Sequence, residues 1–258
     1  MKSALGKIYL WLVFIFLYAP ILVLIVFSFN ASKSRASWEG LSLRWYAELF
    51  RDKAMMSALG NTVIIAVVSA VAAAVVGTIA AVGIHNLKGW KKSFIMNVTY
   101  MPVLNPDIVI GISMMILFIA LSFPRGLASL IIAHITFGLP YVVISVLPKL
   151  AQLDPQIFDA ALDLGATPRE AYTQVILPQI LPGVFTGFLL AFTMSVDDFV
   201  VSFFVTGNGV ANLAISIYSM ARRGINPKIN AVLTLLFAAV VGMMYLIQKR
   251  LRKSAQDF

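Results

Sequence analysis

The chain has 258 residues, of which 60% are apolar and only 12% are charged, and its formal net charge is +9. A soluble domain needs about 25% charged residues to cover its surface, so this composition indicates an integral membrane protein instead. The sequence contains no cysteine, which excludes disulfides, thiolate nucleophiles and sites that depend on cysteine ligands.

Six apolar stretches are long enough to cross a membrane, because a spanning helix needs about 20 apolar residues. They cover residues 8–29, 60–84, 94–122, 127–147, 181–206 and 229–248. The first follows Lys2 and Lys7, as a signal sequence would, but its length favours a retained anchor. We therefore expect an all-α integral membrane protein in which residues 1–258 form a single transmembrane domain, with a polar outer segment at 30–59.

The orientation of this bundle follows only weakly from charge, because basic residues are nearly balanced between its two sides. Tight basic clusters at 88–92 and 249–253 favour a cytoplasmic location for both termini. The cluster at 249–253 is also typical of a stop-transfer segment that anchors to lipid headgroups. The net charge is thus a feature of membrane topology and does not indicate nucleic-acid binding.

The third apolar stretch is interrupted by Pro102 and Pro106, and the fourth contains Pro140. Backbone groups freed by such breaks must be satisfied by protein or by a water-filled cavity. The sequence therefore predicts a broken third span that lines a pathway.

A polar insert at 154–178 separates the fourth and fifth apolar stretches. Its first half predicts a helix with Asp154 as the N-cap, Pro155 as the first helical residue and Gly165 as the left-handed residue that ends it. A second helix is indicated by the capping-box pattern at 167–170. We expect that helix to end by Leu177, because a following proline disfavours helical geometry.

The first helix of the insert presents small and acidic residues. Ala160 and Ala161 keep one face thin, and Asp159 and Asp163 give it a polar edge. An amphipathic loop on the membrane surface is the alternative, but such helices usually favour Lys and Arg over Asp. The insert therefore predicts a compact protrusion to which a partner can bind.

Three carboxylates fall within the apolar stretches, at Asp107, Asp197 and Asp198. Each costs about 2.5–3.5 kcal/mol at the centre of a bilayer, and no Lys or Arg lies in any of the six stretches to pair with them. A cationic ligand would supply the missing partner. Adjacent helical residues point about 100° apart, so Asp197 and Asp198 cannot both face one ligand unless the helix is distorted or the cavity wraps around it. The alternative is that this pair reaches water at the outer end of its span.

The sequence leaves two interpretations open for each of Asp107, Ser195 and Trp45. Asp107 follows Asn105 and Pro106, so it either stabilises the positive end of a half-helix capped by Asn105 or also meets a cation. Ser195 either bonds an amine or bonds its own helix. Trp45 either belongs to an interfacial aromatic belt or makes a cation–π contact at an entrance. His85 and His134 are both expected to be structural.

The insert resembles the EAA loop of type I ABC importer permeases, the MetI-like family. The similarity rests on the spacing of Asp159-Ala160-Ala161, Gly165, Val175 and Leu177-Pro178. Asp159 replaces the usual Glu, and Val175 replaces the usual Ile. The resemblance implies a cytoplasmic helix seated in a groove of an ATPase subunit. This sequence has no G-x-x-x-x-G-K-[ST] loop, so the ATPase is expected to be another polypeptide.

A more specific resemblance covers nearly the whole chain and is to the subfamily of PotC-type spermidine/putrescine permeases. It rests on Trp45-Tyr46, Met101-Pro102, Asn105-Pro106-Asp107-Ile108-Val109, His134-Ile135-Thr136-Phe137, Leu139-Pro140, Ser195-Val196-Asp197-Asp198 and Val205-Thr206-Gly207. The resemblance implies a polyamine importer in which this chain pairs with a PotB-type permease. Two PotA-type ATPases would use ATP and Mg²⁺, and an extracellular PotD-type binding protein would deliver the substrate. No cofactor is expected on this chain, and it is not expected to be an enzyme. The alternatives are the same fold carrying thiamine or iron, and a proton-coupled secondary carrier.

Overall fold

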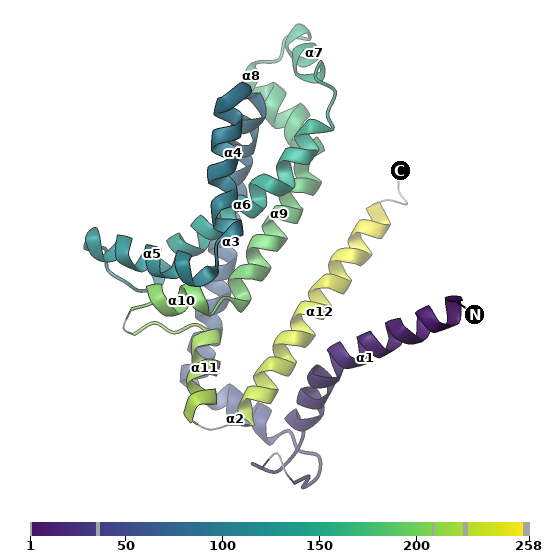
Figure 1. The fold of residues 1–258 in the computed structure, drawn as a ribbon, viewed down its shortest axis with the longest axis vertical. Coiled ribbons are helices and arrows are strands. Elements are labelled where there is room, and N and C mark those ends of the chain that lie inside the picture. Colours follow the sequence, from purple (N-terminus) through teal and green to yellow (C-terminus); the bar gives the residue numbers. More distant parts are fainter. Residues whose placement is uncertain (1, 35–36, 208, 224–226, 255–258) are drawn as a thin grey trace. The chain divides into compact units, whose positions relative to one another are not determined.

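The computed structural model describes residues 2–34, 37–207, 209–223 and 227–254 (Figure 1). The described backbone consists of helices and their connections, with an isolated β-bridge between Asn30 and Leu41. This confirms the predicted all-α class. The chain divides into two compact units, one formed by Met1–Met56 with Ser216–Phe258 and the other by Ser57–Ile215. A single transmembrane domain stays a prediction.

The first unit contains helices α1 (Lys2–Ser28), α2 (Arg44–Arg51) and α12 (Lys228–Ser254), and α12 contacts both of the others. The apolar side chains of α1 are largely exposed, as expected for a surface that faces lipid or another subunit. Lys228 joins α12 to the loop after α2 through an ion pair with Asp52, with 3.4 Å between Nζ and Oδ2. In α2, the hydrogen bond from Arg44 holds the pKa of Glu48 below its ordinary value.

The second unit contains the remaining long helices. They are α3 (Lys53–Asn86), α4 (Gly89–Leu104), α5 (Asp107–Ala120), α6 (Leu127–Ala151) and α9 (Leu177–Asp197), with the short α10 (Val200–Val205). Helix α11 (Leu213–Arg223) begins in this unit and continues into the first one. The insert between α6 and α9 adds α7 (Ile157–Asp163), α8 (Pro168–Glu170) and the π-helical segment η1 (Ala171–Ile176).

Four of the six predicted spans have counterparts of sufficient length in the described residues, at Gly6–Ser28, Lys53–Asn86, Leu127–Ala151 and Pro168–Asp197. Helices α4 and α5 are long and apolar enough to count as a fifth only when they are taken together as one bent pair. The stretch predicted at 229–248 lies in α12, whose described apolar part is Lys228–Gly242. A complete sixth span in α12 stays a prediction, because the structure does not describe the side chains beyond residue 242.

Close packing of α6 against α9 forms the centre of the second unit, and it depends on glycine. A Cβ atom on Gly187 would lie 2.7 Å from the Cα of Val142, and one on Gly183 would lie 2.9 Å from the carbonyl oxygen of Ser145. Small residues are what allow helix backbones to approach this closely in membranes. A Cβ on Gly77 of α3 would also lie 2.8 Å from Val142, so α3 joins the same contact.

Candidate substrate pathway and coupling insert

The predicted break in the third span is present. Helix α4 ends at Leu104, α5 begins at Asp107, and the two axes differ by 106°. The prediction that Asn105 caps α5 is wrong, because Asn105 ends α4 with its N–H bonded to the carbonyl of Met101 and Pro106 occupies the N-cap position of α5. Asp107 is exposed in the first turn of α5, where the positive end of the helix dipole favours its charge.

A second break, between α9 and α10, was not predicted. Asp198 has an extended backbone (φ −63°, ψ 120°), and its carboxylate accepts the backbone N–H groups of Val201 at 3.1 Å and Ser202 at 2.7 Å. The N-cap residue of the short helix α10 is Phe199, and the carboxylate of Asp198, one residue earlier, caps its first turn. An aspartate followed by an apolar turn is a common helix start, and this pattern was the available signal.

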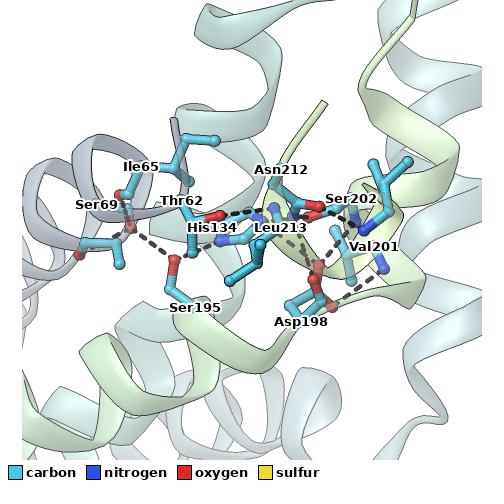
Figure 2. A network of polar contacts seen from close by, with 12 residues as sticks. Thr62, Ile65, Ser69, His134, Ser195, Asp198, Val201, Ser202, Asn212 and Leu213 are labelled. Carbon is cyan, nitrogen blue, oxygen red and sulfur yellow. Dashed lines mark hydrogen bonds and ion pairs between the residues drawn. The ribbon is translucent and has the colours of Figure 1, made fainter. Parts of the chain in front are cut away.

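A buried polar cluster supports this second break (Figure 2). His134 of α6 lies at its centre, with Nδ1 2.5 Å from Ser195 Oγ of α9 and Nε2 3.1 Å from Ser202 Oγ of α10. The same Nε2 is 3.4 Å from Oδ2 of Asp198. Asn212, which precedes α11, donates to Ser202 Oγ at 2.7 Å. The cluster therefore ties three helices and a loop to the break.

The two adjacent acids consequently have different surroundings. The side chain of Asp198 is 8% exposed and faces the cluster, whereas Asp197, the last residue of α9, is exposed. Asp197 lies within electrostatic range of Asp107, which also influences Tyr141 of α6. Asp107 and Asp197 are thus near enough for their charges to interact, and each stands at the end of a helix beside a break.

Ser195 and Trp45 are both buried. The Ser195 hydroxyl bonds His134 and lies 3.4 Å from Ser69 Oγ of α3. The Trp45 side chain belongs to the first unit and is 2% exposed, and its indole N–H donates to the carbonyl of Asn30 at 2.7 Å. The guanidinium of Arg44 lies 5.1 Å from the centre of its ring. A ligand cation would have to displace Arg44 to use that face.

The first half of the insert ends as the sequence predicts but begins later. Helix α7 starts at Ile157 and not at Pro155. The carboxylate of Asp154 accepts the backbone N–H of Gln156 at 2.9 Å and forms a turn, so Asp154 does not cap a helix that begins at Pro155. Gly165 has φ +90°, as expected for a left-handed helix end. The N–H of Ala166 bonds the carbonyl of Ala161 and that of Gly165 bonds the carbonyl of Leu162, which together form a Schellman motif.

The outward surface of α7 differs from the predicted one. Ala161 is buried toward the rest of the insert, so it does not share an exposed face with Ala160. Ala160, Asp159 and Asp163 are exposed, and Leu164 at the helix end is 89% exposed. An exposed leucine beside two carboxylates makes a small apolar knob with a negative edge.

The second half of the insert begins with the predicted capping box. Thr167 Oγ1 accepts the N–H of Glu170 at 3.3 Å, while Glu170 Oε2 accepts the N–H of Thr167 at 2.8 Å. The backbone N–H of Thr167, and then its hydroxyl, hold the pKa of Glu170 below its ordinary value.

The prediction that this helix ends by Leu177 is wrong. The chain continues through η1 into α9, with Pro178 near the first position of α9. In η1 the N–H of Leu177 bonds the carbonyl of Tyr172, five residues earlier, and this wider turn accommodates a proline that an α-helix excludes. The side-chain amide of Gln179 donates to the carbonyl of Val175 at 2.8 Å, which satisfies an acceptor beside the proline.

The insert contacts the C-terminal end of α3 and continues from the C-terminal end of α6. Tyr172 of η1 stacks on Phe158 of α7 with 4.9 Å between ring centres, and its hydroxyl accepts the Asn86 side-chain amide at 3.1 Å. A cavity of about 440 Å³ separates these elements and is lined by residues including His85, Leu153, Asp154 and Asp159.

Residues 73–255 match the family of binding-protein-dependent transport system inner membrane components. The chain belongs to this family, the permease subunits of ABC transporters, and is a multi-pass membrane protein. It is 43% identical to the putrescine transport system permease protein PotI of Escherichia coli (strain K12), over 95% of this chain and 91% of PotI. It is 38% identical to the spermidine/putrescine permease protein PotC of the same strain, over 90% of this chain and 88% of PotC.

Two solved structures share the fold. Both are crystal structures of a bacterial ABC transporter for alginate. One matches with a TM-score of 0.77 at 12% identity, covering 96% of this chain and 95% of the other. The second matches with a TM-score of 0.70 at 16% identity, covering 95% and 91%. At these identities the similarity supports the fold alone.

Proposed function

We propose that this chain is a permease subunit of an ATP-driven importer for putrescine and spermidine. The observation that carries the proposal is its likeness to PotI and PotC over 90–95% of its length. Both substrates are flexible chains with protonated amines, so they need anionic or aromatic partners along an apolar pathway.

Asp107 and Asp197 are the groups we assign to the pathway. Both are exposed, lie within electrostatic range of each other and end helices beside breaks in the third and fifth spans. The six apolar stretches contain no Lys or Arg, so a protonated amine between the two carboxylates would neutralise charge that these stretches leave unpaired. Asp198 and Ser195 support this arrangement from the buried side. Trp45 belongs to the first unit and stays a separate proposal for a cation–π contact, in which a cation would have to displace Arg44.

The insert is the proposed connection to an ATPase. Asp159, Ala160, Asp163 and Leu164 supply its outer surface, while Ala161 and Gly165 shape α7 and its end. The residues Val175, Leu177 and Pro178 join this surface to α9. ATP hydrolysis takes place on that separate chain, with Mg²⁺, and this chain binds no cofactor.

The complete importer would contain one more permease of the PotB type, two PotA-type ATPases and a PotD-type polyamine-binding protein. The insert then lies in the cytoplasm together with both termini of this chain. ATP binding would switch the pathway from inward-facing to outward-facing, and hydrolysis would reset it.

Uptake by the reconstituted complex tests this proposal. ATP-dependent accumulation of putrescine or spermidine, but not of thiamine or ferric ion, is the expected result. Asp197→Asn and Asp107→Asn should each raise KM for uptake by about tenfold or more, because hydrogen bonds to charged groups contribute about 1.5–3 kcal/mol. Asp197→Glu, which keeps the charge, is the control. Transport of thiamine or iron instead, or uptake without ATP, would refute the assignment.

A further inference from the structure

The residue that decides which acid faces the pathway is His134. It is 2% exposed and lies between the ends of α9 and α10, with contacts to Ser195 before the break and to Ser202 and Asp198 at and after it (Figure 2). Nothing in the proposed transport chemistry requires a histidine here. Its contacts therefore call for an explanation of their own.

The neighbours of the imidazole indicate which of its two nitrogens carries the hydrogen when the ring is neutral. A neutral imidazole has one N–H and one accepting nitrogen. Nε2 lies 3.1 Å from Ser202 Oγ and 3.4 Å from the carboxylate of Asp198, so we assign the hydrogen of the neutral ring to Nε2. Nδ1 then accepts the hydroxyl hydrogen of Ser195 at 2.5 Å. In this arrangement the ring links the last turn of α9 to the first turn of α10.

The consequence for the backbone follows from Asp198. Its carboxylate is held by His134 on one side and by two N–H groups of α10 on the other. Holding the side chain in this position keeps its backbone extended, which ends α9 at Asp197. If α9 continued as a regular helix, the two acids would point about 100° apart and neither break nor cap would exist.

We propose that His134 is a positioning residue for transport. By holding Asp198 in the buried cluster, it fixes the break that directs the carboxylate of Asp197 toward the substrate, where it acts with Asp107. The inference rests on the proposed function, since it assigns the pathway role to Asp197.

Two isosteric substitutions separate positioning from simple filling of space. The amide of Gln can place a donor near the Nε2 position, toward Asp198 and Ser202, whereas the amide of Asn reaches only the Nδ1 position, toward Ser195. In the assembled complex, His134→Ala and His134→Asn should raise KM for putrescine or spermidine about tenfold with Vmax changed less than about twofold. His134→Gln should restore most of the affinity. Thr136→Ala is the control on the same helix, because the Thr136 hydroxyl bonds only the carbonyl of Ile132 in its own helix among the described contacts.

A chemical readout independent of transport accompanies these kinetics. The chain has no cysteine, so Asp197→Cys introduces a unique thiol into it, with cysteine-free partner subunits. A water-soluble thiol reagent should modify this cysteine, and His134→Ala or His134→Asn should slow the modification about tenfold while His134→Gln does not.

The outcomes discriminate between the two levels of the proposal. Equal KM values and equal modification rates for the Gln and Asn variants would overturn the positioning role, even if the Ala variant fails to assemble. Modification rates that change as expected, together with a complex of the unaltered chain that transports neither putrescine nor spermidine, would preserve the positioning role and refute the proposed substrate.

Discussion

Replacing Gly165 tests the coupling insert through its backbone. Its φ of +90° is a conformation that side chains disfavour, yet a Cβ at this position would have no described heavy atom within 4 Å. Any effect of substitution must therefore come from backbone strain and not from a steric clash. The left-handed region costs about 1–2 kcal/mol for an L-residue, more for a β-branched one and less for Asn.

That strain acts on the Schellman motif that sets the angle between α7 and α8. A cost of about 1–2 kcal/mol lowers the ratio of correctly formed to unformed insert by about fivefold to thirtyfold, which matters most when the turn is only marginally stable. We therefore expect association with the ATPase, and ATP-dependent uptake, to weaken in the order Gly, Asn, Ala, Val.

Co-purification of the ATPase with each variant, together with uptake by reconstituted complexes, measures this order. Gly83→Ala in α3 is the matched control, because its surroundings are equally open but its φ is not in the left-handed region. Equal association for Gly165→Asn, Gly165→Ala and Gly165→Val would refute the strain argument. Normal association and normal uptake in all three would refute the coupling role itself.

Three further predictions concern single contacts. Asp198→Ala removes the cap of α10 and should destabilise the complex by about 1–2 kcal/mol in thermal unfolding, whereas Asp197→Ala should not. Gly187→Ala forces a Cβ to within 2.7 Å of the Val142 Cα and should cost about 1–3 kcal/mol by the same measurement, unlike Gly83→Ala. The pKa of Glu170 is lowered, so the contribution of its capping bonds should be complete above the ordinary pKa of 4.5 and lost only as the pH falls through the lowered value. ATPase association should therefore not change between about pH 6 and 8. A change in that range that disappears in Glu170→Gln would contradict the capping role.

Local signals in the sequence predicted the local features well. Gly165 ends α7 in the left-handed conformation, Thr167 and Glu170 form a capping box, and the third span breaks at Pro106. Each of these depends on residues at most five positions apart, so a short stretch of sequence contains the whole interaction. The class of fold followed from composition for the same reason, because lipid restricts spanning elements to a few forms.

Features that depend on distant residues were not predictable. Asp197 and Asp198 are neighbours in sequence, and the buried one, Asp198, contacts a histidine more than 60 residues earlier. The start of α9 is a second case, since a proline that normally ends a helix is accommodated by the π-turn of η1. In the first case tertiary contacts override the preference of the local sequence, and in the second a local π-turn replaces the α-helical geometry that proline excludes.

The two ends of α9 connect the insert to the acids. Its 21 residues span about 30 Å, which is close to the thickness of the hydrocarbon core, with η1 at one end and Asp197 at the other. Gly183 and Gly187 bring α9 so close to α6 that the two helices cannot slide past each other without backbone clashes. His134 of α6 in turn holds the break that follows Asp197. A displacement of the insert must therefore move both helices and the break together, which gives a push on the insert a direct physical route to the charge that we assign to the substrate.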